Sequence, residues 1–429
     1  MADPRSGKIG LLRDLNLNII LNIIAKKGPL SRVEVVRQSG LPQATVSRIT
    51  NEFLEAGLIL KERFDESSGG RPPRLLQLNP TAGYVVGVKL DKDSVLVAIC
   101  DLSCTIIHSS TVSLESNTPF ERTLSTVVEA IQHCLLQAHM TVHDILGVGV
   151  GLSGRIDAER GICHSSPSFP WRNVALAAKI EEVLHIPVRI DNNINTLAVA
   201  EQHFGLGQAS PNFLLLVIGR DIGLSVVLAN EIYHGHHGSA GEYGHVIIDR
   251  SSTAPHCRCG QRGCLEAIVS SYDQTHVAPR QTATNANADK DPAVLRTKVA
   301  SENEQADTAL TYIGTMLGIT LANLINIFDP NRVFMMGHIA QNIHVAEAMR
   351  NTMSSMLFDQ EISSNILSIV EGDSIREEQW ARGAASLVLN ELFQPPLYEH
   401  GPQTMIVVED LLVSASSRIS SNKARKGLP

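Results

Sequence analysis

Three cysteines near the middle of the chain have the types and spacing that suit a metal ion. Cys257, Cys259 and Cys264 lie within eight residues, and two glycines between them let the loop fold back on itself. Three thiolates and one imidazole complete the closed tetrahedral shell that is typical of structural zinc. We therefore predict one Zn²⁺ held by these cysteines and His245. His256 is the alternative fourth ligand, and a loop of three reduced cysteines is the alternative without metal.

The seven cysteines are unevenly placed in 429 residues, and the N-terminus does not resemble a secretory signal. This usage fits a reducing cytosol with a metal site better than a disulfide framework. We expect a cytoplasmic bacterial protein. The four remaining cysteines have apolar neighbours and are expected to be inert core residues: Cys100, Cys104, Cys134 and Cys163.

The first sixty residues predict three short helices. Apolar residues recur at helical spacing from Leu15 to Ile24, and Ser31 to Glu34 forms a capping box that starts the second helix. A third helix over 43–56 carries short polar side chains on its outer face, which is the character of a recognition helix in the DNA major groove. The predicted DNA-contacting residues of this helix are Gln43, Ala44, Thr45, Ser47 and Arg48. A helical cap with solvated polar residues is the simpler alternative.

A predicted hairpin follows these helices and has Gly70-Arg71-Pro72 at its tip. A stiff, narrow tip suits an arginine that enters a minor groove, so Arg71 is the sixth predicted DNA contact. Residues 1–80 hold 12 Lys and Arg against 8 Asp and Glu, although the whole chain has a net charge of −8. The local positive charge supports a winged helix-turn-helix that binds double-stranded DNA.

Beyond residue 84 the pattern changes to alternating strands and helices, which indicates an α/β architecture. Strands are expected near 84–90, 94–101, 145–151, 187–190, 213–218, 224–229 and 332–336. Residues 401–429, which include a Ser-, Lys- and Arg-rich end from 414 to 429, are expected to be a flexible tail.

Acidic and amide residues lie on both sides of the cysteine loop. Gly241–His245 precedes it, Glu266 follows it directly, and Asp191–Asn195 lies upstream. A carboxylate accepts hydrogen bonds from two neighbouring hydroxyl groups at once, and an amide both donates and accepts. These residues are therefore candidates for binding a ligand that carries hydroxyl groups. The alternative is that they form a hydrogen-bond network that only orients the zinc ligands.

The order of these motifs resembles the ROK family, which comprises repressors, open reading frames and sugar kinases. The resemblance runs from about residue 10 to 395 and includes the glycine-rich segment 147–154 and the segment 326–330. It implies a two-lobed, actin-like and sugar-kinase-like domain of the ribonuclease H type. The expected domains are the winged helix-turn-helix over 1–80, the two-lobed domain over 81–400 and the tail over 401–429.

The resemblance also implies a hexose pocket lined by the zinc histidine and neighbouring polar residues. The residues that match are Asn192, Asn193, Glu242, His245 and Glu266. The DNA-binding segment ahead of this domain is similar to that of the repressor branch, which includes xylose, N-acetylglucosamine and glucose-responsive regulators.

Three segments depart from the phosphate-binding turns of ROK kinases. The first turn lies in 87–93 and lacks a glycine pair, the second lies in 219–223 and the third in 336–339. Kinases of this family carry Asn-Asp where this chain has Asn192 and Asn193, and an amide has no useful basicity near neutral pH. We therefore predict no catalytic residues and no enzymatic activity.

The main hypothesis is a repressor of carbohydrate metabolism genes whose sugar ligand, bound between the lobes, alters the spacing of two DNA-binding heads. The alternatives are an ATP-dependent hexose kinase and a repressor that senses a sugar-transporter protein. A homo-oligomer is expected from the symmetry of operators, as a dimer or a tetramer. The uncharged run 309–328 is long enough to span a membrane, but asparagines and threonines interrupt it, so no membrane insertion is expected.

Overall fold

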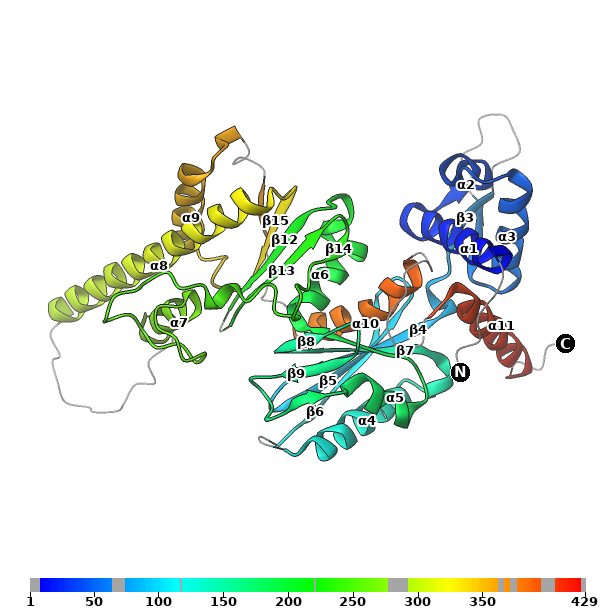
Figure 1. Cartoon of the computed structure of the whole chain (residues 1–429), viewed down its shortest axis with the longest axis horizontal. Helices are drawn as coiled ribbons and strands as arrows, with labels where there is room; N and C mark the ends of the chain where they lie inside the picture. The colour runs from blue at the N-terminus through cyan, green and yellow to red at the C-terminus, as the bar shows by residue number, and fades with distance from the viewer. Residues whose placement is uncertain are drawn as a thin grey trace. The chain divides into compact units, whose positions relative to one another are not determined.

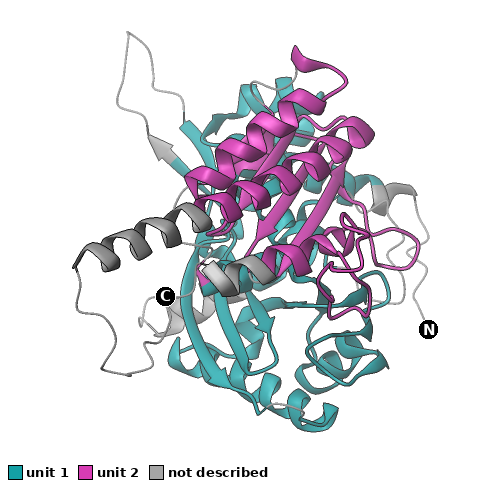
Figure 2. Cartoon of the chain, turned by 90° about the vertical axis from the view of Figure 1, so that its left-hand side faces the viewer, with its two compact units in different colours: residues 1–205, 377–429 teal, residues 206–376 magenta. Residues whose placement is uncertain are grey.

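The computed structural model describes residues 8–63, 74–115, 118–219, 221–276, 292–361, 366–370, 376–394 and 406–425. The chain forms two compact units. Unit 1 comprises residues 1–205 and 377–429, and unit 2 comprises residues 206–376 (Figure 2).

The N-terminal part of unit 1 is a three-helix head with a small sheet (Figure 1). Its helices are α1 (Lys8–Lys27), α2 (Arg32–Ser39) and α3 (Gln43–Glu55). Its strands pair antiparallel in the order β1-β3-β2, and they are β1 (Leu30–Ser31), β2 (Ile59–Arg63) and β3 (Arg74–Leu78). The three predicted helices and the hairpin are therefore confirmed. The hairpin tip with Arg71 lies outside the described residues.

Helix α2 begins as the sequence indicates, although only half of the predicted capping box forms. The Ser31 hydroxyl accepts from the Glu34 amide at 3.2 Å. The Glu34 carboxylate accepts from Arg37 and Gln38 on the same helix. The serine alone therefore caps this helix.

The rest of unit 1 is an α/β lobe around a five-stranded sheet of order β11-β7-β4-β5-β6. The strands are β4 (Tyr84–Leu90), β5 (Ser94–Asp101), β6 (Ile106–Ser113), β7 (Ile145–Leu152) and β11 (Val188–Asn192). A second sheet consists of β8 (Arg155–Asp157), β9 (Ile162–Ser165) and β10 (Arg172–Val174). The helices are α4 (Phe120–Gln137), α5 (Leu176–Leu184), α6 (Asn193–Phe204), α10 (Glu377–Phe393) and α11 (Val408–Arg425).

Helix α10 lies so close to the five-stranded sheet that the strands must carry glycine beneath it. A Cβ atom at Gly87 would lie 1.8 Å from the Ala381 carbonyl oxygen, and one at Gly149 would lie 1.8 Å from the Ala384 carbonyl oxygen. No side chain fits in either place. Gly87 of β4 and Gly149 of β7 therefore allow this close helix packing.

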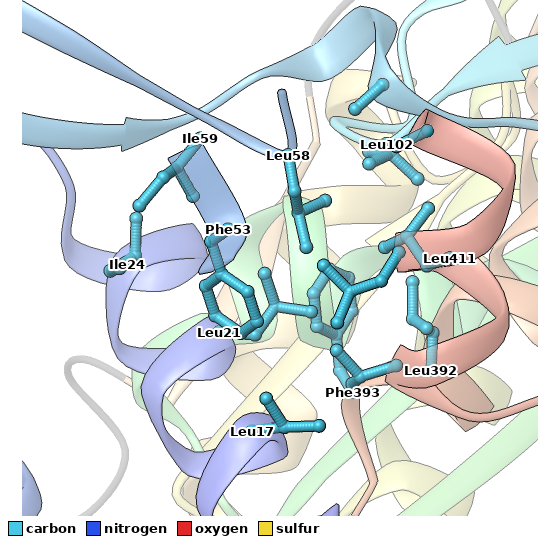
Figure 3. Packing of buried hydrophobic residues seen from close by; sticks show 14 of the residues in the cluster. Leu17, Leu21, Ile24, Phe53, Leu58, Ile59, Leu102, Leu392, Phe393 and Leu411 are labelled. Carbon is cyan, nitrogen blue, oxygen red and sulfur yellow. The ribbon is translucent and has the colours of Figure 1, made fainter. Parts of the chain in front are cut away.

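The head and the lobe share one hydrophobic core (Figure 3). Leu17 and Leu21 of α1 pack in the same cluster as Leu392 and Phe393 of α10 and Leu411 of α11. Burial of these side chains stabilises the head and the lobe together.

The predicted flexible tail is wrong for residues 408–425, which form α11. The Ser- and Lys-rich composition hid an apolar stripe formed by Leu411, Leu412 and Ala415, all of which are buried. The limits predicted for the three domains stay predictions.

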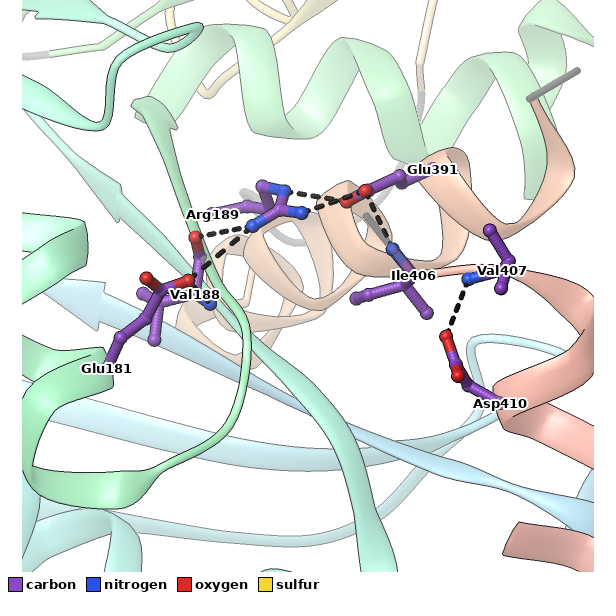
Figure 4. A network of polar contacts seen from close by, with 7 residues as sticks. All are labelled: Glu181, Val188, Arg189, Glu391, Ile406, Val407 and Asp410. Atoms are coloured by element: carbon purple, nitrogen blue, oxygen red, sulfur yellow. Dashed lines mark hydrogen bonds and ion pairs between the residues drawn. The ribbon is translucent and has the colours of Figure 1, made fainter. Parts of the chain in front are cut away.

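A polar network fixes the end of α10 against strand β11 (Figure 4). Arg189 Nε and Nη2 donate to the two oxygens of Glu391 at 2.6 and 2.8 Å, in the bidentate geometry that favours Arg. Glu391 also accepts from the Ile406 amide at 2.9 Å, and Asp410 accepts from the Val407 amide. The strand, α10 and the start of α11 are therefore linked.

Unit 2 is a second α/β fold, with a sheet of order β14-β13-β12-β15-β16. Its strands are β12 (Phe213–Ile218), β13 (Ile222–Leu228), β14 (Glu231–Ile232), β15 (Arg332–Met336) and β16 (Leu367–Ile369). Its helices are α7 (Leu265–His276), α8 (Pro292–Phe328) and α9 (Ile343–Met356). All seven strands predicted for the two lobes are present, with boundaries that differ by at most two residues.

Helix α8 contains one segment, Asp307–Phe328, that is long and apolar enough to cross a membrane. Half of this window is buried inside the protein, and Leu317 and Leu321 have no exposed surface. A core helix of a globular domain has the same composition.

Candidate functional site

The four residues predicted to bind metal lie together in unit 2. One ligand atom from each of His245, Cys257, Cys259 and Cys264 lies within 4.8 Å of all the others. Cys257 Sγ is 3.4 Å from His245 Nδ1, and Cys259 Sγ is 3.7 Å from Cys264 Sγ. A tetrahedral zinc with Zn–S and Zn–N bonds of about 2.3 and 2.1 Å separates two sulfur ligands by about 3.8 Å and a sulfur from a nitrogen ligand by about 3.6 Å. The donor set and these distances fit such an ion. The histidine that lies with the three cysteines is His245 and not the alternative, His256.

The protonation of these thiols differs in the metal-free protein. Burial raises the pKa of Cys257, and it raises the pKa of Cys264 to about 12. The Gln261 amide, which hydrogen-bonds to the sulfur, lowers the pKa of Cys259. A divalent cation would displace the thiol protons because the thiolate is the ligand form.

His245 and Glu242 form the second part of the site. His245 presents Nδ1 to Cys257, while its Nε2 lies 3.8 Å from Glu242 Oε2. The Glu242 side chain is about half exposed, with a relative accessibility of 51%. A metal on Nδ1 therefore leaves Nε2 and an accessible carboxylate side by side, which suits the binding of a hydroxyl group.

Local backbone geometry sets the position of these two side chains. Gly241 has φ +88°, and a Cβ atom there would lie 2.0 Å from the Leu224 carbonyl oxygen. The short helix Tyr243–His245 follows, and the buried Tyr243 hydroxyl bonds to Thr320 of α8. The glycine thus allows close packing on β13, and the tyrosine anchors the turn to the core.

Glu266, the third predicted sugar residue of unit 2, is 5% exposed on the first turn of α7. Its carboxylate accepts from the Ile222 amide at 3.2 Å and pairs with Arg258 at 2.9 Å. The contact of Arg258 with Glu266 has no signal in the sequence, because no periodicity or motif distinguishes an arginine between two cysteines.

Asn192 and Asn193 lie in unit 1, where β11 ends and α6 begins. Asn192 caps α6 by accepting from the Ile194 amide at 2.9 Å, and it donates to the Gly154 carbonyl at 3.0 Å. Asn193 donates to Ser153 Oγ at 3.3 Å. Both amides are therefore fixed at the carboxyl end of parallel strands, which is where α/β sheets bind ligands. A single pocket that uses these asparagines together with Glu242, His245 and Glu266 stays a prediction.

Charged side chains form ion pairs in two of the segments predicted to correspond to kinase phosphate turns. Lys89 Nζ lies 2.5 Å from Glu377 and 3.7 Å from Asp91. Asp221 pairs with Arg258 at 3.1 Å. The first and second turns therefore each contain a carboxylate, Asp91 and Asp221, that is paired with a cation.

The outer face of α3 presents the polar residues predicted from the sequence. Gln43, Ala44 and Arg48 are exposed, and Thr45 and Ser47 are partly exposed. The preceding Pro42 gives the helix no side-chain cap. The first amides of α3 and these side chains are therefore available to a DNA backbone or base edge.

The other four cysteines are buried, as the sequence predicts. Burial raises the pKa of Cys163 to about 11, and it raises the pKa of Cys134. Thiols of this kind are unreactive near neutral pH.

The chain is similar to known proteins over most of its length. The model of the ROK family matches residues 85–391, and a model of winged helix-turn-helix DNA-binding domains matches residues 13–59. The chain is 32% identical to the xylose repressor of Bacillus subtilis over 81% of this chain and 89% of that protein. It is 26% identical to the transcriptional dual regulator NagC of Escherichia coli over 92% and 97%.

Solved structures of two ROK proteins have similar folds. A ROK family transcriptional regulator, a homologue of the Escherichia coli MLC protein, gives a TM-score of 0.73 at 23% identity over 95% of this chain and all of that one. The ROK hexokinase of Thermus thermophilus gives a TM-score of 0.56 at 25% identity over 71% of this chain and 97% of that one. The winged helix-turn-helix and the sugar-kinase-like fold expected from the sequence are therefore confirmed, and the chain belongs to the ROK family.

Proposed function

We propose that this protein is a DNA-binding transcriptional repressor of carbohydrate metabolism genes, controlled by a sugar or sugar derivative. One observation carries the proposal. The chain joins a winged helix-turn-helix with a polar α3 face to a sugar-kinase-like domain that has Asn193 where ROK kinases carry the catalytic aspartate. Related chains of nearly the same length are named xylose repressor and N-acetylglucosamine repressor.

The residues proposed to bind the sugar are Asn192 and Asn193 of unit 1 and Glu242, His245 and Glu266 of unit 2. The accessible Glu242 carboxylate beside His245 Nε2 supports this assignment. We also propose one Zn²⁺ at His245, Cys257, Cys259 and Cys264, a homo-oligomeric state and a cytoplasmic location. The ion holds the loop closed and orients His245.

A DNA selection followed by titration tests the proposal. Random duplexes bound by the purified protein identify an operator, and gel-shift titrations with xylose, glucose and N-acetylglucosamine then measure the coupling. We expect one sugar at millimolar concentration to change operator affinity about 5–150-fold. Arg48→Ala should weaken operator binding by about 1–3 kcal/mol, whereas Lys179→Ala, at an exposed side chain of α5, should not. If DNA binds but no sugar changes its affinity, a sugar-transporter protein becomes the better candidate for the signal.

Metal content is tested separately. Elemental analysis should give one zinc per chain, and Cys259→Ala should lose most of it because three ligands hold a structural ion poorly. Full metal retention in Cys259→Ala would exclude this ligand set.

The second candidate function is an ATP-dependent hexose kinase, because the fold is shared with a ROK hexokinase. The carboxylates at the first two turns and the amide of Asn193 oppose it. A coupled assay with ATP and common hexoses should show no turnover. A rate above about 1 s⁻¹ would establish the kinase instead.

A further inference from the structure

Arg258 lies between two of the cysteine ligands, and its guanidinium group contacts two carboxylates at once. Nε is 2.9 Å from Glu266 Oε1, Nη2 is 3.3 Å from Glu266 Oε2, and Nη1 is 3.1 Å from Asp221 Oδ1. The planar fork of arginine makes this bidentate pairing with one carboxylate while a third nitrogen binds another group.

The Glu266 carboxylate depends on this arginine because it is buried. Its side chain is 7% exposed, and the Ile222 amide is the other donor to it among the described residues. A buried carboxylate that loses its cation keeps the cost of desolvation without the compensating charge. Loss of Arg258 would therefore displace the Glu266 carboxylate from its present position.

Asp221 belongs to a different segment, the turn between β12 and β13. The Gly219 amide donates to the Asp221 carbonyl at 3.2 Å across this turn. Glu266 approaches the same turn from α7 through the Ile222 amide. Arg258 thus joins the cysteine loop, the β12–β13 turn and the first turn of α7.

We propose that Arg258 is a positioning residue for the sugar site, which it links to the metal-bound cysteine loop. The guanidinium group fixes the buried Glu266 carboxylate and the β12–β13 turn relative to Cys257 and Cys259, the two cysteines that flank Arg258. The inference rests on the proposed sugar-binding function. It adds that sugar affinity depends on a residue that neither binds the metal nor touches the sugar.

The test compares Arg258→Ala and Arg258→Lys with Arg262→Ala. Arg262 is the matched control, because it lies in the same loop with the same charge but donates to the Ser252 and Ala254 carbonyls. Zinc content should remain near one per chain in all three variants. Isothermal titration calorimetry uses the sugar, among xylose, glucose and N-acetylglucosamine, that binds the wild-type protein most tightly. Arg258→Ala should bind this sugar about 10–100-fold more weakly than the wild type does. Arg258→Lys should recover part of this loss, and Arg262→Ala should bind as the wild type does.

Hydrogen–deuterium exchange gives a readout that needs no sugar. The peptide that contains the Ile222 amide should exchange faster in Arg258→Ala than in the wild type or in Arg262→Ala. If the wild-type protein binds none of the three sugars, the proposed function fails at its ligand, while faster exchange still supports the link through Arg258. Unchanged exchange, unchanged sugar affinity, or loss of affinity only together with zinc would overturn the proposal.

Discussion

The His203 side chain is a buried titratable group that makes the stability of unit 1 depend on pH. Burial and the nearby Lys26 charge lower its pKa to about 4, although a hydrogen bond with Asn390 opposes this shift. The unfolded chain binds the proton near pH 6.5 and the folded chain binds it only near pH 4, so stability falls as the pH drops through this window. Between pH 7.5 and 5.0 we expect a loss of about 2 kcal/mol from this group.

Both tryptophans, Trp171 and Trp380, belong to unit 1, so their fluorescence reports its unfolding. Urea titrations at the two pH values should show a smaller loss for His203→Gln, which keeps a polar group for Asn390 but does not titrate. His133→Gln, on the exposed face of α4, should behave as the wild type. Equal losses in all three proteins would contradict the assignment.

The ion pair between Arg189 and Glu391 gives a second residue-scale prediction. Both side chains are nearly buried, at 12% and 6% exposure, so Arg189→Met leaves an unpaired buried carboxylate. We expect this change to lower the free energy of unfolding of unit 1 by about 3–5 kcal/mol. Adding Glu391→Gln should recover much of the loss, since the amide still accepts from Ile406. A double variant that is less stable than the single one would show that the pair is not the cause.

At the scale of elements, the helices and strands that could be predicted from the sequence are those with regular hydrophobic periodicity. The head helices and the long strands were predicted because their apolar residues recur at regular spacing. The strands β8, β9 and β10 have three or four residues each, which is too few for a pattern to develop. Strand β6 was missed because its residues 108–111 are all polar. The role of Arg258 depends on a tertiary contact and has no local signal.

Helix α11 shows how a few apolar residues outweigh polar composition. Leu411 is fully buried in the core that the head shares with the lobe, whereas Val413 on the same helix is 71% exposed. We expect Leu411→Ala to destabilise unit 1 by about 2–5 kcal/mol and Val413→Ala to change it by less than about 0.5 kcal/mol. Tryptophan fluorescence during urea unfolding measures both. Equal effects of the two changes would mean that α11 does not pack as described.

At the scale of the whole molecule, the head is a part of unit 1 and not a separate globule. Asn18 of α1 donates to the Leu392 and Gln394 carbonyls at 3.1 and 2.8 Å, and Arg13 bonds to both Glu52 of α3 and Glu409 of α11. We therefore expect a fragment of residues 1–80 to lose the cooperative melting of the full chain, because Leu17 and Leu21 become exposed. Circular dichroism during heating tests this. A fragment that melts as sharply and at the same temperature as the full chain would exclude the dependence.

The shared core also sets a rule for building chimeric regulators. Replacing only residues 1–80 with the head of another regulator would pack a foreign α1 helix against the end of α10 and against α11. The apolar side chains of that helix would not match those of α10 and α11. A transplantable cassette would instead include three separated pieces of chain: the head, the end of α10 and α11. In this protein the portable module is a three-dimensional neighbourhood and not a stretch of sequence.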